Sequence, residues 1–199
     1  MNIVWKGQSF FEVQTETALI SIDPFDEKET GLKLPKTEAD ILLSSKKVSF
    51  GNPFLINSAG EFEIKDVFIQ GIQGLKDKEP ILIYKIEAEG MKLLHVSELK
   101  QKELTEEQIE EIGDVDVLMI PVGGKDALDA KEAKNIISQI EPRIVIPMRY
   151  KIPNLQISLD GIEGFLKQMG AEKVVPEKRL KLNLRTLPTE ETKIVVLEP

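Results

Sequence analysis

The sequence predicts two β-sheets packed face to face, with helices on the outside. Short runs rich in β-branched and aromatic residues, separated by glycine and proline, fill the first half of the chain; such runs are typical of strands joined by tight turns. Helical periodicity appears only in the second half, and the last segment again looks like strands. Because strands and helices in this order bury their apolar faces in layers, we expect one compact domain covering residues 1–199.

The first half is expected to consist of hairpins and meanders. Strands are predicted at residues 3–5, 9–13, 18–22, 39–43, 54–56, 67–69, 81–86 and 92–96. Gly90 and Met91 lie between the last two runs and predict a hairpin turn there. Residues 26–38 are rich in charge and predict a loop.

The second half begins with a helix whose two ends are both marked. Thr105 and Gln108 have the spacing of a capping box, in which each side chain bonds the backbone N–H of the other residue. Gly113 is a typical residue for the end of that helix. A continuous apolar strand is predicted next, at residues 115–120, and it stops at Pro121.

A second helix and its two flanking strands predict a βαβ unit. Asp129 and Glu132 begin the helix, and Pro142 stops it. Its apolar stripe consists of Ala130, Ala133, Ile136, Ile137 and Ile140. Residues 143–147 form the next apolar strand. Strand, helix and strand in this order are typical of parallel pairing.

The end of the chain predicts a third helix and closing strands. The helix is expected to begin at an Asp160 cap and to end at Gly170. Alternating apolar residues then predict a strand through Leu180, Leu182 and Leu184. A last strand is expected at residues 194–197.

Composition excludes several kinds of chemistry. The 199 residues include 26 Lys and Arg, 34 Asp and Glu, one histidine and no cysteine, for a net charge of −8. Without cysteine there can be no disulfide, thiolate nucleophile or iron–sulfur cluster. One imidazole, that of His95, rules out a zinc site built mainly from histidine. The acidic balance argues against nucleic acid as a partner, because phosphate binding needs clustered basic residues.

No segment indicates secretion or a membrane. The first residues lack the charged and apolar regions of a signal peptide, and no run approaches the roughly 18 apolar residues of a membrane span. The absence of cysteine suits a reducing compartment. We therefore expect a cytoplasmic protein that does not bind membranes.

Several segments resemble a known family. They read IVWKGQSFF at residues 3–11, ISIDPF at 20–25, GEFEI at 60–64, IGDVDVLMIPVGG at 112–124 and PRIVIPM at 142–148. In this order they resemble the metallo-β-lactamase-fold superfamily, and within it the branch of predicted metal-dependent hydrolases related to L-ascorbate-6-phosphate lactonase. The resemblance implies a four-layer αββα sandwich of two mixed β-sheets and, in active members, zinc or another divalent metal.

The first metal-ligand motif of that family is altered here. Active members carry T-H-x-H-x-D-H after the strand that residues 39–43 resemble. In this chain Ser44 matches the Thr position, but Ser45, Lys46 and Lys47 follow without any His or Asp. The ligand loop also looks several residues short.

The other two ligand motifs are altered as well. The family's H-L-G-D-L reads HVSEL here, so His95 is kept while Glu98 replaces the metal-bridging aspartate. The family's P-M-H-Y reads PMRY, which places Arg149 at the last ligand position. Because catalytic zinc takes about three protein ligands and arginine is permanently charged, we expect no catalytic metal and no other cofactor.

Each candidate catalytic residue has a structural interpretation beside the functional one. His95 is either held by a hydrogen bond in the core or acts as a ligand or general base. Glu98 and Arg149 form either an ion pair that fills the former metal space or a pocket for an anionic substrate. Asp23 either ends its strand at a turn or keeps the role of supporting the metal shell that the resemblance implies.

The candidates for binding an anionic ligand lie in loops. They are Asp23, Ser44, Ser45, Lys46, Lys47 and Arg149. The alternative for the two lysines is an ordinary solvated loop. Gly123 and Gly124 would either seat an anion on their backbone N–H groups or form a tight turn.

These observations support three functional hypotheses. The first is a pseudoenzyme that has lost its metal centre and serves in binding or assembly, paired with a second copy of itself or with an active relative. The second is a slow hydrolase of a small anionic ester, lactone or phosphodiester, with His95 as base and Arg149 as anion anchor. The third is a sensor that holds a phosphate-bearing molecule with Arg149, Lys46 and Lys47.

Overall fold

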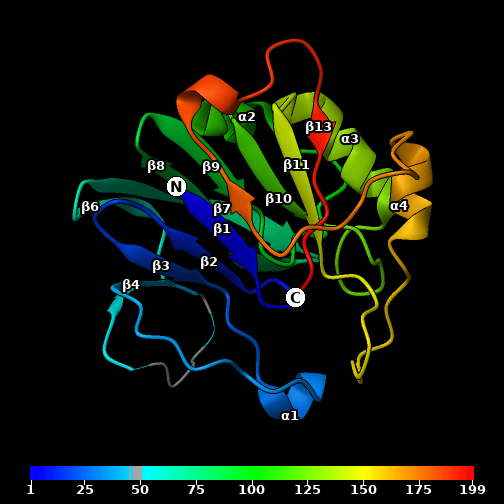
Figure 1. The fold of residues 1–199 in the computed structure, drawn as a ribbon, viewed down its shortest axis with the longest axis horizontal. Helices are drawn as coiled ribbons and strands as arrows, with labels where there is room; N and C mark the ends of the chain where they lie inside the picture. Colours follow the sequence, from blue (N-terminus) through cyan, green and yellow to red (C-terminus); the bar gives the residue numbers. More distant parts are fainter. Residues whose placement is uncertain (45, 47–50) are drawn as a thin grey trace.

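Two mixed β-sheets form the centre of the molecule (Figure 1). A computed structural model of the chain describes residues 1–44, 46 and 51–199. The strands are β1 (Asn2–Trp5), β2 (Phe11–Gln14), β3 (Leu19–Ile22), β4 (Ile41–Leu43), β5 (Phe54–Ile56), β6 (Gly60–Ile64), β7 (Val67–Lys76), β8 (Glu79–Ala88), β9 (Met91–His95), β10 (Val117–Pro121), β11 (Ile144–Met148), β12 (Leu180–Lys181) and β13 (Lys193–Ile194). The helices are α1 (Glu27–Thr30), α2 (Glu106–Ile112), α3 (Ala130–Ile140), α4 (Glu163–Gln168) and the 3-10 turn η1 (Leu184–Thr186).

The two sheets differ in strand order but share a mixed topology. The six-stranded sheet has the order β12-β1-β2-β3-β4-β5, and the seven-stranded sheet has the order β13-β11-β10-β9-β8-β7-β6. In the first, β3, β4 and β5 pair in parallel. In the second, β6 to β9 pair antiparallel, and β9, β10, β11 and β13 pair in parallel. The predicted βαβ unit is β10-α3-β11, and the predicted sandwich of two sheets is confirmed.

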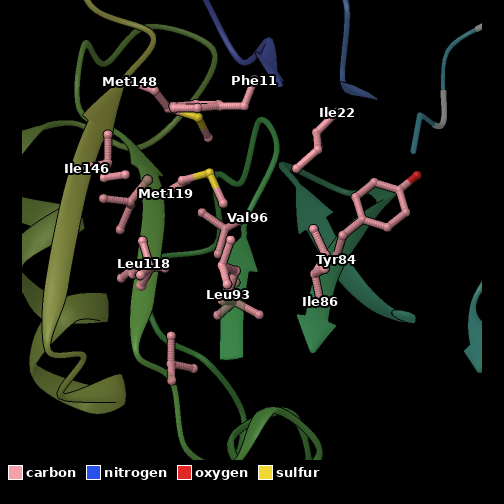
Figure 2. Packing of buried hydrophobic residues seen from close by; sticks show 14 of the residues in the cluster. Phe11, Ile22, Tyr84, Ile86, Leu93, Val96, Leu118, Met119, Ile146 and Met148 are labelled. Atoms are coloured by element: carbon pink, nitrogen blue, oxygen red, sulfur yellow. The ribbon is translucent and has the colours of Figure 1, made fainter. Parts of the chain in front are cut away.

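The core lies between the sheets. Phe11 and Ile22 of the first sheet face side chains of the second, among them Tyr84, Leu93 and Met119, and all five are fully buried (Figure 2). Each buried side chain of this size is worth about 1.5–3 kcal/mol through removal of apolar surface from water. This shared apolar layer fixes the two sheets against each other and so positions the loops at their ends.

The helices cover the seven-stranded sheet. α2 contacts β7, α3 contacts β10, and α4 packs on α3. α3 begins with the predicted capping box, in which the Asp129 side chain accepts from the backbone N–H groups of Lys131 and Glu132. No helix within the described part of the chain is long and apolar enough to cross a bilayer.

The outer side of the six-stranded sheet is covered differently. Leu42 lies between two residues that face the core, so it points outward, where it packs with Phe10 and Phe25. Leu32 and Leu34, which lie in the loop between the helix at residues 27–30 and β4, pack against this small cluster. α1 is a single turn and lies on the opposite side of the molecule from α2 and α3 (Figure 1).

Three local predictions were wrong. Residues 26–38 contain α1, because the Asp26 side chain caps the backbone N–H of Lys28 and so stabilises a turn. α4 begins after Ile162 rather than at Asp160, whose backbone pairs with Gly123 and Lys151 instead.

The third wrong prediction concerns the C-terminal alternation. β12 ends at Lys181, and Leu184 is 54% exposed in the 3-10 turn. Asn183 caps that turn through the backbone N–H of Arg185, so the strand pattern is interrupted there.

Gly123 allows the loop after β10 to approach the loop after β11. A Cβ at Gly123 would lie 2.3 Å from the Arg149 carbonyl oxygen and 2.9 Å from the Tyr150 Cα. No side chain fits in that space. The two loops are therefore in backbone contact at the end of the sheet where Arg149 projects.

Gly123→Ala should destabilise the protein by about 1–3 kcal/mol, because the added methyl group must displace backbone atoms. Gly164→Ala is the matched control: a Cβ there meets nothing within 4 Å, and alanine favours a helix by up to about 1 kcal/mol over glycine. Urea denaturation of both variants measures the difference. Similar changes in the two variants would contradict the close approach at Gly123.

Candidate functional site

The candidate site lies where the parallel strands end. Asp23 follows β3, Ser44 follows β4, His95 is the last residue of β9, and Arg149 follows β11. Parallel strands bring their carboxyl ends to the same edge of a sheet, and ligand sites are commonly built there. The fold therefore brings together residues that lie far apart in the sequence.

The loops at this edge repeatedly hold a non-glycine residue in the left-handed backbone region. Gln8, Asp23, Ser97, Lys125 and Arg149 have φ of 53°, 46°, 51°, 64° and 52°. For a residue with a side chain this conformation is unfavourable and needs support from its surroundings. Such residues gather at functional sites more often than elsewhere, which marks this edge as the place to look for one.

Arg149 is the centre of a buried ion-pair network. Its side chain is 3% exposed. Its Nη1 donates to Glu98 Oε1 at 2.9 Å, and its Nη2 donates to Asp126 Oδ2 at 2.5 Å. The guanidinium thus joins the loop after β9 to the loop after β10, and both of its terminal nitrogens are bound to carboxylates.

Two lysines complete the network. Lys46 Nζ donates to Glu98 Oε1 and Lys76 Nζ donates to Glu98 Oε2, both at 2.6 Å. Lys76 also reaches Asp126 Oδ2 at 3.2 Å. Burial alone would raise the pKa of Glu98, but the charges of Arg149 and Lys46 and the lysine hydrogen bonds outweigh it and lower that pKa to about 2. Glu98 is therefore a fixed carboxylate.

His95 is a neutral core residue with a defined tautomer. The Ser97 backbone N–H donates to Nδ1 at 3.1 Å, so the ring hydrogen must sit on Nε2, which donates to the Ser9 carbonyl oxygen at 2.8 Å. Burial is the main cause that lowers the pKa of His95 to about 4, although the bond to Ser9 opposes it. The ring also packs edge-on against Phe11.

Asp23 is the carboxyl group whose proton is held most strongly. Its side chain is 10% exposed and lies 3.8 Å from His95 Nδ1. Burial raises the pKa of Asp23 to about 7, partly offset by a contact with Ser97, and the nearby Glu98 charge raises it further. Asp23 therefore exchanges its proton near neutral pH, which His95 does not.

The resemblance implies a metal ion at this edge, and the side chains present do not fit one. The Nδ1 lone pair of His95 is used by a backbone N–H, the Glu98 oxygens are bound by three cations, and Arg149 adds a permanent positive charge. Among residues 1–44, 46 and 51–199 there is no group of three or more metal-ligating side chains.

The loop candidates have local partners. The buried Ser44 hydroxyl bonds the backbone of Lys46, accepting from its N–H at 3.2 Å. Lys46 is part of the ion-pair network rather than an unpaired solvated lysine. Ser45 and Lys47 lie outside the described residues.

Gly123 and Gly124 form a tight turn. The Gly124 N–H donates to the Leu128 carbonyl oxygen, so it is not available to an anion. Gly123 is required by the close approach of Arg149.

Sequence reasoning missed four residues of this edge. Lys76 and Asp126 join the ion pairs, and the buried Gln8 and Ser9 line a cavity together with other residues of the network. Lys76 and Asp126 belong to no motif, and their partners lie more than 20 positions away. The only local signal was a pair of polar residues directly after Gly7.

Asp23→Asn should change how stability depends on pH. The folded-state pKa of Asp23 lies above its ordinary value of 3.8, so its stabilising contribution is complete below pH 4 and is lost as the pH rises to about 7. The variant lacks this loss. Its free energy of unfolding, measured by urea denaturation, should therefore rise relative to that of the wild type by more than about 1 kcal/mol between pH 4.5 and 7.5; a constant difference would show that Asp23 ionises normally.

Arg149→Met should cost about 3 kcal/mol, because it leaves Glu98 and Asp126 with fewer partners in a buried place. Arg143→Met is the matched control: the Arg143 side chain is half exposed and contacts Asp116 at 3.4 Å, so its loss should cost at most about 1 kcal/mol. Chemical denaturation of both variants measures this. Equal losses would contradict the central role of Arg149.

Comparison with known proteins identifies the family. A family profile described as a β-lactamase superfamily domain matches residues 2–149. The crystal structure of a candidate Zn-dependent hydrolase of the metallo-β-lactamase superfamily from Thermotoga maritima is similar with a TM-score of 0.83 and 32% identity, covering 99% of this chain and 98% of that one.

Curated archaeal relatives agree. A UPF0173 protein of Pyrococcus furiosus is 28% identical over 178 residues, which cover 75% of this chain and 83% of the relative. A UPF0173 metal-dependent hydrolase of Methanopyrus kandleri is 25% identical over 222 residues, covering 86% and 94%. This chain therefore belongs to the β-lactamase superfamily and has the metallo-β-lactamase fold.

Proposed function

We propose that this protein is a non-catalytic member of its superfamily, in which an ion-pair network takes the place of a catalytic metal centre. The observation that carries the proposal is the Arg149 guanidinium, which bridges Glu98 and Asp126 at the carboxyl ends of the parallel strands. The relative from Methanopyrus kandleri is named a metal-dependent hydrolase. On this proposal, the present chain shares its fold and lacks its metal.

Electrostatics supports the proposal. A cation about 4 Å from a guanidinium is repelled by roughly 4 kcal/mol per unit charge at an effective dielectric of 20. To bind Glu98, a metal ion would also have to displace Lys46, Lys76 and Arg149. A hydrolytic metal must in addition keep a coordination position open for water. The charge repulsion and the displacement of these cations both oppose the binding of a metal ion.

We infer that a protein of this kind serves in binding or assembly. Its partner would be a small anionic ligand, a second copy of the chain or an active relative. The scaffold supports such a role, because the ion pairs hold the loops at the strand ends in one arrangement without a metal. The absence of cysteine from the chain supports the reducing cytoplasm as the place of action.

The purified protein should contain well under one equivalent of zinc, manganese or iron. The measurement is elemental analysis after incubation with each metal and dialysis against a chelator-free buffer, with carbonic anhydrase as the zinc-retaining control. Arg149→Met, which removes the guanidinium charge from this position, should be analysed in parallel. A stoichiometric metal in the wild type, retained through dialysis, would overturn the proposal.

A metal-independent hydrolase is the second candidate, and Asp23 is the observation in its favour. A carboxyl group with a pKa near 7 suits proton transfer at neutral pH. His95 does not suit the role of base, since both ring nitrogens are engaged in the core. Arg149 does not suit the role of anion anchor, because both of its terminal nitrogens bind carboxylates.

Small esters, lactones and phosphodiesters should show no turnover above background. The screen is run with the wild type and Asp23→Asn, both treated with a chelator. Turnover by the wild type that disappears in the variant would favour the hydrolase and contradict a non-catalytic role. General acid–base catalysis alone contributes about 10²–10⁴-fold, so such turnover would be slow but measurable.

A further inference from the structure

A hollow with basic walls lies at one side of the sandwich, between β12 and β13. These are the outer strands of the two sheets on that side, and residues of both line the hollow. Its volume is about 360 Å³. The buried residues of its lining are apolar, namely Ile144, Leu180 and Leu182. The exposed residues include Arg179, Lys181 and Lys193, so an apolar floor is surrounded by positive charge.

The positive charge of this hollow is not neutralised within the chain. Among the described residues, none of Arg179, Lys181 and Lys193 forms an ion pair. Glu177 is the one carboxylate among the described residues of the lining, so the cations outnumber it three to one. The whole chain has a net charge of −8. The hollow is therefore a local exception that attracts negative charge.

An acidic loop stands beside the hollow. Residues 187–192 lead from η1 to β13 (Figure 1), and Glu190 and Glu191 are exposed in this loop. Neither forms an ion pair within the part of the chain that the structure describes. Pro188 lines the basic hollow, and the loop also borders a second hollow of about 470 Å³ at the end of α3. The loop is thus a ridge between two hollows, with its two carboxylates unpaired.

We propose that two copies of this chain pair through these features, with the acidic loop of each copy in the basic hollow of the other. Glu190 and Glu191 then meet the cations that have no partner in their own chain. The contact is isologous: one twofold axis between loop and hollow satisfies both copies and closes the assembly. An acidic patch far from the hollow would instead pair head to tail and leave open chains.

The surroundings of the hollow also suit an interface. Val175 is 78% exposed and Leu184 is 54% exposed, and both lie in the stretch 175–186, which supplies most of the lining. Apolar side chains beside a charged rim are typical of protein–protein contacts. Nine residues line the basic hollow and eleven line the second one, with Pro188 common to both. A surface of this extent approaches the roughly 20–30 residues a side of a stable interface.

The wild type should form a dimer, with twice the monomer mass of 22.4 kDa, at concentrations below about 1 mM. Sedimentation velocity measures this. A wild type that stays monomeric would overturn the proposal. If such a monomer also gained thermal stability with pyrophosphate, the hollow would belong to a small anion instead of a second copy.

Reversing the charge of the loop should separate the two copies. In Glu190→Lys/Glu191→Lys the loop and the hollow carry like charges, so the dissociation constant should rise about tenfold or more. Glu106→Lys/Glu110→Lys is the matched control, because it changes the net charge equally at exposed positions of α2. The control should remain as dimeric as the wild type. Equal behaviour of the two variants would show that the loop is not at the interface.

Reversing the charge of the hollow provides the decisive arm. Lys181→Glu/Lys193→Glu should also be monomeric, since an acidic loop then faces an acidic hollow. Mixed in equal amounts, the loop variant and the hollow variant should form a heterodimer, because each loop again meets a hollow of opposite charge. Two monomeric variants that do not associate on mixing would contradict the reciprocal contact.

The inference rests on the assembly role in the proposed function and gives that role a surface. No residue of the basic hollow or of the acidic loop belongs to the ion-pair network around Arg149. A failed dimer would therefore leave the absence of a catalytic metal untouched. A metal found by elemental analysis would contradict the proposed function, whatever the result of sedimentation.

Discussion

The arrangement of the strand ends depends on one side chain, that of Arg149. It is almost fully buried, yet its charge is balanced by Glu98 and Asp126, which come from two other loops. An isolated charge could not occupy this place, because the cost of desolvation would far exceed what the surrounding core contributes. The three loops therefore depend on one another, and the geometry of the edge is a property of the network rather than of any one segment.

The backbone at this edge reflects the same constraint. Gln8, Asp23, Ser97 and Arg149 all adopt left-handed conformations, which these residues reach only where tertiary contacts hold them. The contacts are visible: the Arg149 N–H donates to the Gln8 carbonyl oxygen, the Asp23 N–H donates to that of Leu43, and the Ser97 N–H donates to His95. Local strain is thus offset by hydrogen bonds within these loops and, for Arg149 and Gln8, between loops of the two sheets.

The sequence was sufficient for the fold and for part of the site. Periodicity and capping residues predicted the strands, the Asp129 helix and the βαβ unit, because these signals are local. The prediction of a strand continuing past Leu182 was wrong, because Asn183 caps a 3-10 turn there. At the site, the Glu98–Arg149 pair was anticipated from two motif positions. Lys76 and Asp126 were not, because a lysine and an aspartate carry no sign of which distant charge they meet, and the burial of Gln8 depends on both sheets.

The single histidine also connects the two halves of the sandwich. Its ring belongs to β9 of one sheet, and its Nε2 hydrogen bond ends on Ser9, in the turn between two strands of the other. In strong acid a second hydrogen would have to sit on Nδ1, where it would point at the amide hydrogen of Ser97. The cost of that protonation would fall on the loop directly after β9, whereas the Nε2 hydrogen bond that joins the two sheets would persist.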